Sequence, residues 1–321
     1  MSLTDAERTS FVGAYWALAA VFAFATNDVV IKFLSGGYPL YQVMFVRSLV
    51  GLLFVVAVLV PLTGTWHMLK TKRLKTHLLR GLCVVFANFT FFLALAALPL
   101  ADAVAIFFIS PLLISVFSVI FLKEYVGPRR WAAILLGLIG VLIVVRPGTS
   151  AFQIASLLPL LAAVGYALLH ILTRRIGGTE NATSMVFYIQ LTFLAVSSTA
   201  GLALGHGSFD SYDHPSAIFL FRAWVWPTPF DLGLMIFSGM VTSIGGYMIS
   251  QAYMRSEAAL VAPFEYIALP LSVAFGFYLF AEMPDAVALS GIGLILVSGL
   301  VMIWREATAR RRGVLESPNR L

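Results

Sequence analysis

The chain has 321 residues, of which 60% are hydrophobic and only 11% are charged. A soluble globular protein carries about 25% charged residues, so this composition excludes an ordinary soluble domain. The net charge of +6 does not indicate a nucleic-acid partner, because the basic residues border apolar segments, where they orient membrane helices. The single cysteine, Cys83, excludes an intramolecular disulfide and a cysteine-based metal site.

Ten apolar segments of membrane-spanning length follow one another along the chain. A helix needs about 20 apolar residues to cross the ~30 Å hydrocarbon core, and the strict alternation of barrel strands is missing. The expected spans are residues 11–34, 39–61, 81–98, 102–122, 130–146, 153–172, 184–204, 231–253, 258–281 and 286–304. The sequence therefore predicts an all-α integral membrane protein with both termini on one side.

The basic residues predict which side that is. With cytoplasmic termini, 17 of the 21 Lys and Arg residues fall in cytoplasmic segments and two, Arg146 and Arg222, fall outside. This asymmetry follows the positive-inside rule, so the basic tail 307–321 is expected in the cytoplasm. Segment 65–80 holds five basic residues and several leucines, which predicts an amphipathic surface helix or, alternatively, a basic loop. Segment 205–230 is expected to be an external loop with aromatic interface anchors, or a lid.

One helical pattern occurs twice. Residues 101–125 form an apolar run that contains Pro111, and residues 258–284 form a similar run that contains Pro270. Each run is followed by a short link and one further apolar segment. Five spans per half is an odd number, so two related halves must lie in opposite orientations, with the substrate site expected between them. The predicted halves are residues 1–148 and 149–306.

Short motifs mark both copies in the same order. In the first half they are residues 96–105 (AALPLADAVA), 110–113 (SPLL) and 137–141 (GLIGV). In the second half they are residues 258–263 (AALVAP), 269–271 (LPL) and 291–293 (GIG). This paired set resembles the EamA domain of the drug/metabolite transporter superfamily.

The resemblance implies two EamA repeats of five helices each, a bacterial inner-membrane location and a central cavity lined mainly by spans 1, 3, 4, 6, 8 and 9. Residues 42–47 and 263–266 are similar to the branch with riboflavin and S-adenosylmethionine importers. The expected function is therefore uptake of such a vitamin or cofactor by alternating access. The alternative is an exporter of amino acids or drugs from the same superfamily.

Charged residues inside the spans are the first candidates for the site. A charge at the bilayer centre costs at least about 2.5–3.5 kcal/mol on insertion scales, so each one predicts a partner or a function. Asp28 and Lys32 are four residues apart on one helix face and either pair with each other or face the cavity beside Asn27. Arg47 either binds an anionic substrate group or neutralises Asp28 or another buried acid.

Glu265 is the other intramembrane acid. It lies two residues after Pro263, which bends a helix and frees a backbone carbonyl. A buried carboxylate beside a bend is a candidate for proton coupling or substrate contact, with Tyr266 as an aromatic hydrogen-bonding neighbour. The alternative is a structural pair of Glu265 with Arg47 or Lys32.

Neutral polar and aromatic residues complete the candidate set. Asn88, Tyr247 and Gln251 fall inside spans, where they must be satisfied by a neighbouring helix, water or a ligand. Phe92 and Phe108 could stack on an aromatic substrate, although 26 phenylalanines make chance lining common.

No P-loop, serine-hydrolase or zinc-protease signature is found, so no catalytic residue, metal site or cofactor is expected. An intramembrane enzyme is a remote alternative, for which the long loop offers only Asp210, Asp213 and His214. The expected partners are a small-molecule substrate and the lipid bilayer, with the protein as a monomer or homodimer.

Overall fold

The computed structural model describes residues 5–64, 66–123, 128–176, 180–208, 212–255 and 264–311, and every regular element within them is a helix. The elements of the first half are α1 (Asp5–Ser35), α2 (Leu40–Phe54), η1 (Val55–Leu59), α3 (Val60–Thr63), η2 (Trp66–Leu69), α4 (Leu74–Leu95), α5 (Leu100–Phe107), α6 (Ser110–Leu122) and α7 (Pro128–Val145). Those of the second half are η3 (Ile154–Ser156), α8 (Leu157–Ile176), α9 (Ala182–Leu204), α10 (Pro215–Phe221), α11 (Pro229–Arg255), α13 (Ala268–Phe280) and α14 (Ala286–Arg311).

Seven of these helical segments are long and apolar enough to cross a membrane, and three more are shorter apolar helices. The outer face of α7 shows why the chain needs lipid. Its side chains Leu135, Ile139 and Leu142 share one face of the helix and are each at least half exposed. Continuous apolar surface of this kind is unfavourable in water and favourable in hydrocarbon. The chain is a multi-pass membrane protein.

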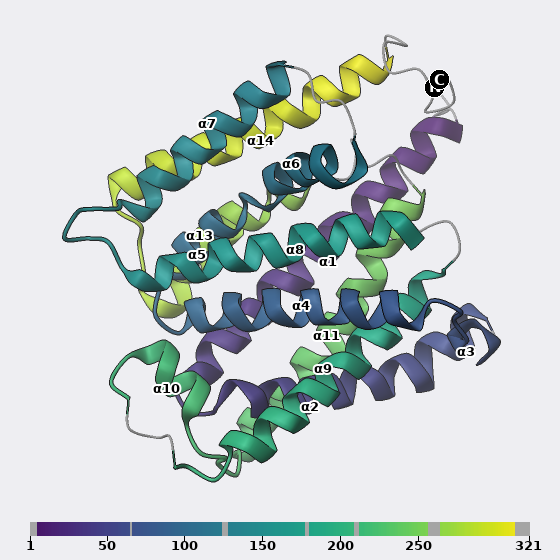
Figure 1. The fold of residues 1–321 in the computed structure, drawn as a ribbon, viewed down its shortest axis with the longest axis vertical. Helices are drawn as coiled ribbons and strands as arrows, with labels where there is room; N and C mark the ends of the chain where they lie inside the picture. The colour runs from purple at the N-terminus through teal and green to yellow at the C-terminus, as the bar shows by residue number, and fades with distance from the viewer. Residues whose placement is uncertain are drawn as a thin grey trace.

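The helices pack in pairs that join distant parts of the chain. Helix α1 packs on α11, α4 on α8, α2 on α9, and α7 on α14. Figure 1 shows α7 and α14 side by side at one edge of the bundle and α2 with α9 at the opposite edge. Gly140 and Gly291 make the α7–α14 approach possible, because a Cβ on either residue would meet the backbone carbonyl of the other at 3.0 Å or less.

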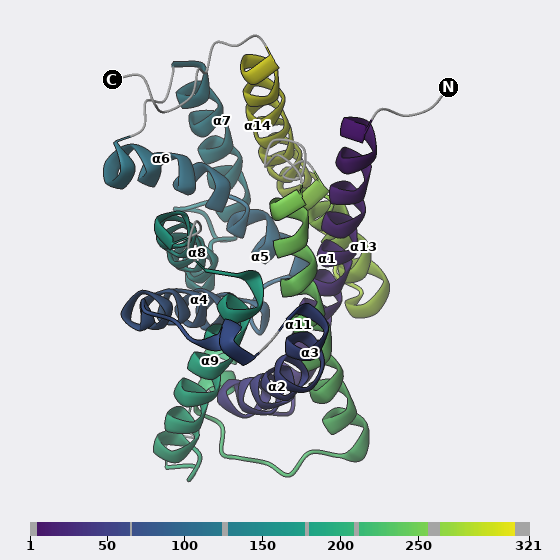
Figure 2. The same ribbon diagram turned by 90° about the vertical axis from the view of Figure 1, so that its right-hand side faces the viewer.

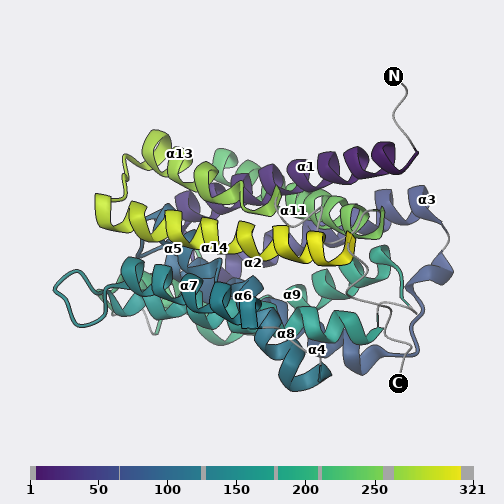
Figure 3. The same ribbon diagram turned by 90° about the horizontal axis from the view of Figure 1, so that it is seen from above.

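The start of α1 and the end of α14 lie at one end of the bundle (Figures 1 and 3). Figures 1 and 3 place the start of α1, the last turns of α14 and α3 together, with α10 at the other end in Figure 1. Figure 2 shows the same helices from the side, with the α7 and α14 edge far from α2 and α9. We call the end with the α1 start the terminal end and the opposite end the loop end.

Two helices break at matching places. Helices α5 and α6 are separated by a turn at Phe108 and Ile109, and Pro111 lies in the first turn of α6, where a missing N–H costs nothing. A turn at Tyr266 and Ile267 likewise precedes α13. The single expected span 102–122 is therefore two helices. Pro263, the other expected bend, lies outside the described residues.

The broken helices also end alike. Helix α6 ends at Lys123 with φ of 56°, and α13 ends at Ala281 with φ of 55°. In each case the backbone N–H of the left-handed residue bonds back to a carbonyl of the last turn, at Ser118 or Gly276. Two non-glycine residues in this uncommon conformation at equivalent positions are one local structure used twice.

The structure contradicts part of two sequence expectations about connections. Segment 65–80 is not an amphipathic surface helix, because only η2 is helical before α4 begins at Leu74. His77 and Arg80 are consequently buried inside the bundle. In segment 205–230, Phe219 is a fully buried residue of α10 and is not an interface anchor, whereas Trp226 is 88% exposed.

Candidate functional site

Asp28 lies on α1, which packs on α11, and keeps part of its surface accessible. Its neighbour Asn27 is buried, accepts a hydrogen bond from Ser238 on α11 (2.7 Å) and donates to Asp28 Oδ1 (3.3 Å). The contact fixes α1 against α11 at this level. Asp28 is therefore held in place from one side and left open on another.

Arg47 on α2 is buried, with 4% of its surface exposed. The carbon of its guanidinium lies 5.4 Å from the centre of the Phe92 ring and 4.9 Å from that of Phe193. Cation–π contacts of this kind stabilise a guanidinium away from water. Asp28 attracts Arg47 electrostatically, and Nε of Arg47 has no hydrogen-bond partner in the described part of the chain. Phe193 was not among the predicted residues.

Lys32 does not pair with Asp28, although their spacing allows it. Its Nζ lies 3.0 Å from Glu282 and donates to the carbonyls of Leu95 (3.0 Å) and Leu98 (2.7 Å), which end α4. A helix C-terminus attracts cations, and this local attraction outweighs the expected pair. Glu282 in turn accepts a hydrogen bond from the backbone N–H of Leu100, at the start of α5 (3.0 Å).

A run of aromatic rings leads from Arg47 across α4 and α5 to α8. Ring centres lie 5.9 Å apart for Phe92 and Phe91, 5.0 Å for Phe91 and Phe107, and 5.3 Å for Phe107 and Tyr166. Glu265 interacts electrostatically with Tyr166 and Tyr266, which places this acid at the far end of the run. Tyr166 was missed from sequence because nothing local marks it among 11 tyrosines.

Tyr266 is held by its surroundings. Its ring lies 5.1 Å from that of Phe108, the residue at the matching break between α5 and α6. The outer atoms of the ring fill a notch on α14, because a Cβ on Gly299 would be only 2.0 Å from it. Tyr266 is 3% exposed, so it sets the position of the broken helix and of Glu265 beside it.

The predicted neutral residues have mixed environments. Asn88 donates to the carbonyl of Val84 within its own helix (3.0 Å). Tyr247 contacts Trp16 edge to face at 6.3 Å, and Gln251 lies one turn further along α11. Gln190, which was not among the predicted site residues, makes a buried interhelical hydrogen bond, since its amide donates to Ser243 at 3.0 Å.

A second polar cluster lies at the terminal end. Glu180 accepts a hydrogen bond from Thr71 (2.8 Å) and lies 3.2 Å from Nε2 of His77. Arg80 donates to Thr173 on α8 at 2.9 Å. These contacts tie the start of α4 to the end of α8 and the start of α9.

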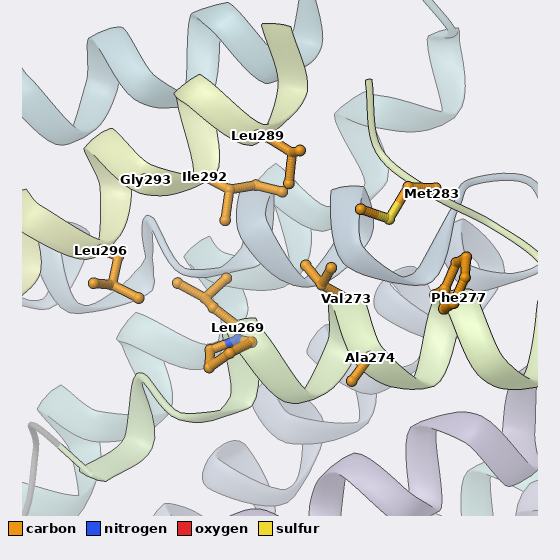
Figure 4. Close-up of a pocket in the computed structure, with 10 residues that line it drawn as sticks. Leu269, Val273, Ala274, Phe277, Met283, Leu289, Ile292, Gly293 and Leu296 are labelled. Carbon is orange, nitrogen blue, oxygen red and sulfur yellow. The ribbon is translucent and has the colours of Figure 1, made fainter. Parts of the chain in front are cut away.

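The open grooves of the surface are not this site. Figure 4 shows one of about 410 Å³, lined by facing apolar side chains of α13 and α14, among them Val273, Phe277 and Leu296. Another lies between α1 and α11 and is also almost wholly apolar. Grooves without polar groups in a membrane protein suit lipid chains better than a polar metabolite. Among the described residues, no group of three or more His, Cys, Asp or Glu side chains is placed to hold a metal ion.

One family model matches part of the chain. Residues 11–146 match the model of the EamA-like transporter family. A solved crystal structure of 21% sequence identity superposes with a TM-score of 0.62 over 98% of this chain and 100% of that one, which supports the fold alone.

Three similar proteins have names that state a cargo. The S-adenosylmethionine uptake transporter of Rickettsia bellii (strain RML369-C) is 28% identical over 97% of this chain and 100% of its own length. The riboflavin transporter of Vibrio cholerae serotype O1 is 29% identical, over 93% and 95% respectively. The pseudopaline exporter CntI of Pseudomonas aeruginosa is 26% identical, over 90% and 95%.

Proposed function

We propose that this chain, which carries an EamA-like transporter domain at residues 11–146, imports a small organic metabolite across the bacterial inner membrane by alternating access. The uptake proteins for S-adenosylmethionine and riboflavin are similar over nearly their whole length, which supports an importer of a vitamin- or cofactor-like compound. The observation that carries the proposal is the presence of two opposite charges, the partly accessible Asp28 and the buried Arg47, near each other beside the aromatic run. Charges inside a membrane span are costly, and those without an ion-pair partner mark a functional site.

The proposal includes ten spans in two inverted five-helix repeats, with cytoplasmic termini. The matching helix breaks at Phe108 and Tyr266 support it, as do the matching left-handed ends at Lys123 and Ala281. The pairs α1 with α11 and α4 with α8 also exchange under a two-fold relation of the halves. Rocking of one half against the other would then expose the central site to each side in turn.

The loop end, which faces outward in this proposal, is closed by contacts between the halves. Lys32 of the first half is paired with Glu282 of the second, and Arg146 at the end of α7 is paired with Asp285 at the start of α14. An importer must open this end to admit its substrate. The two ion pairs are therefore the contacts that we expect to break and re-form in each cycle.

Glu265 is the proposed coupling acid. It directly precedes Tyr266 at the helix break and interacts electrostatically with Tyr166 on α8. A carboxylate that gains and loses a proton at a hinge can couple a proton gradient to substrate movement.

The test is uptake by purified protein in proteoliposomes. The panel contains labelled S-adenosylmethionine, riboflavin and aromatic amino acids, each with and without an inward proton gradient. We expect saturable uptake of one compound, stimulation by the gradient, and loss of that stimulation in Glu265→Gln. Glu316→Gln in the predicted tail is the matched control and should behave as wild type. Absence of uptake for every compound under any gradient contradicts the proposed function.

A further inference from the structure

Asp28 and Arg47 carry opposite charges in one region of the bundle and do not form an ion pair. Within the described residues, no guanidinium nitrogen of Arg47 comes within 4.0 Å of a carboxylate oxygen, and Asp28 has no cation within that distance. Their closeness follows from the helices that carry them. Asn27, next to Asp28, bonds to Ser238, and the adjacent Gly239 packs on the backbone carbonyl of Arg47, which a Cβ there would approach to 2.6 Å.

The nearest alternative partner of Asp28 is engaged elsewhere. Lys32, one turn away on α1, uses its donors on Glu282, on the carbonyl of Leu95 at the end of α4 and on that of Leu98 just beyond it. The only hydrogen bond to the Asp28 carboxylate from the described residues comes from the Asn27 amide, at 3.3 Å. Because Asp28 also remains partly accessible, the carboxylate is free to accept from a ligand.

The guanidinium of Arg47 is held in place and has one edge available to a ligand. Rings of Phe92 and Phe193 lie against its guanidinium and restrict the orientation of that flat group. The Nε–H edge is left without a partner among the described residues. Guanidinium edges bind carboxylates through two parallel hydrogen bonds, and Nε is a regular member of such pairs.

Two opposite, separated charges suit a ligand that carries both complementary charges. We propose that Asp28 and Arg47 form a clamp for a zwitterionic head group, with the ligand's carboxylate on Arg47 and its ammonium on Asp28. The clamp rests on the proposed transport function and assigns its substrate class as α-amino acids and their derivatives. A ligand of this kind leaves neither buried charge uncompensated, whereas an uncharged ring system would leave both. The adjoining aromatic run from Phe92 to Tyr166 then receives the rest of the molecule.

The test compares ligands that differ by one charged group. Equilibrium binding to purified protein in nanodiscs is measured for S-adenosylmethionine, its decarboxylated derivative, its 2-oxo acid derivative and riboflavin. Wild type should bind the complete amino acid at least roughly 30-fold more tightly than either derivative, because each lacks one half of a buried charge pair. Arg47→Gln should lose the preference for the carboxylate, and Asp28→Asn the preference for the ammonium group.

Two further variants separate recognition from folding. Arg47→Lys keeps the buried charge and loses the flat edge, so it should fold and still lose most of the carboxylate preference. Arg80→Gln removes another buried arginine, at the terminal end, and should keep the full preference. Equal binding of S-adenosylmethionine and both derivatives by wild type overturns the clamp, as does a preference unchanged in Arg47→Lys and Asp28→Asn.

Failure of the clamp is distinguishable from failure of transport. Saturable uptake of riboflavin, with no competition from any amino-acid compound, overturns the clamp and leaves the transporter assignment intact. A protein that neither binds nor moves any compound of the panel contradicts the transporter assignment, and the clamp falls with it.

Discussion

Lys32 on α1 is bound to Glu282, 250 residues further along the chain, at an N–O distance of 3.0 Å. Only 9% of the lysine side chain and 28% of the glutamate side chain are exposed. Both residues also stabilise helix ends, since Lys32 donates to the last carbonyl of α4 and to that of Leu98 just beyond it, and Glu282 accepts from the first N–H of α5. One ion pair therefore joins α1, α4, α5 and α13 at the loop end.

Glu282→Gln should favour opening of the loop end. Loss of a partly buried pair costs the closed state about 1–2 kcal/mol, which is roughly tenfold in the closed-to-open equilibrium. The measurement is the rate at which an external thiol reagent modifies a cysteine introduced at Ser35 in a Cys83→Ala background. We expect this cysteine to react faster in the Glu282→Gln variant than in the same protein with Glu282 unchanged.

A charge exchange supplies the control. The exchange of Lys32→Glu with Glu282→Lys keeps two opposite charges at these positions. It also places a carboxylate against the carbonyls of Leu95 and Leu98, to which a carboxylate cannot donate. The exchanged protein should remain as open as the single variant. Full rescue by the exchange would show that the two helix ends contribute nothing.

Asp285 predicts a pH dependence of stability. Its hydrogen bond from Arg146, together with one from the backbone N–H of Ala288, lowers the pKa of Asp285 from 3.8 to about 2. Because the folded pKa lies below the unfolded one, the stabilisation is complete above about pH 5 and is lost as the pH falls towards 2. Asp285→Asn should lower the Tm at pH 7, and the difference from wild type should shrink below about pH 4 and vanish only as the pH falls through about 2. A constant difference between the two proteins across this range would contradict the assignment.

Gly299 should tolerate no side chain while Tyr266 is present. A Cβ at Gly299 would lie 2.0 Å from the tyrosine ring, so Gly299→Ala must displace the broken helix, at a cost of about 1–3 kcal/mol. Gly293 on the same helix meets nothing within 4 Å, and Gly293→Ala should be nearly neutral. Thermal unfolding in detergent measures both. A second change, Tyr266→Leu, should recover part of the loss in Gly299→Ala, and no recovery would place the clash elsewhere.

The terminal-end cluster predicts a different phenotype. Glu180→Gln keeps an acceptor for Thr71 and loses the charge opposite His77, so the tie between α4 and α9 weakens. We expect a lower Tm. We also expect faster modification, by a reagent added from the cytoplasmic side, of a cysteine introduced at the terminal end. The rate at which the cysteine introduced at Ser35 reacts from outside should not change. Thr71→Val is the milder comparison, because it removes one neutral hydrogen bond. Faster modification from the outside in Glu180→Gln would contradict this division of the two ends.

The sequence was sufficient for features that repeat or that depend on composition. Apolar windows located most spans within a few residues; for example, α9 begins at Ala182 where 184 was expected. Pro111 was noted within the apolar run 101–125, and it lies in the first turn of α6, directly after the helix break, because proline favours the first turn of a helix. Arg47 and Asp28 were found because a charge inside an apolar run is conspicuous.

Pairings between distant residues were beyond the sequence. The spacing of Asp28 and Lys32 on α1 allowed the prediction that they pair. In the structure, the carbonyls of Leu95 and Leu98 and the carboxylate of Glu282 hold the lysine instead. His77 and Arg80 were assigned to a surface segment because their neighbours are basic, whereas both are buried. Phe193 and Tyr166 lack any local mark, since their roles come from packing against other helices.

Counterflow tests the central claim most directly, because only a carrier with one site exposed alternately to each side can produce it. Proteoliposomes are loaded with the unlabelled substrate identified by the uptake panel and diluted into a trace of the labelled compound. We predict a transient accumulation of label above its equilibrium level, absent from protein-free liposomes. Simple equilibration without an overshoot would contradict alternating access.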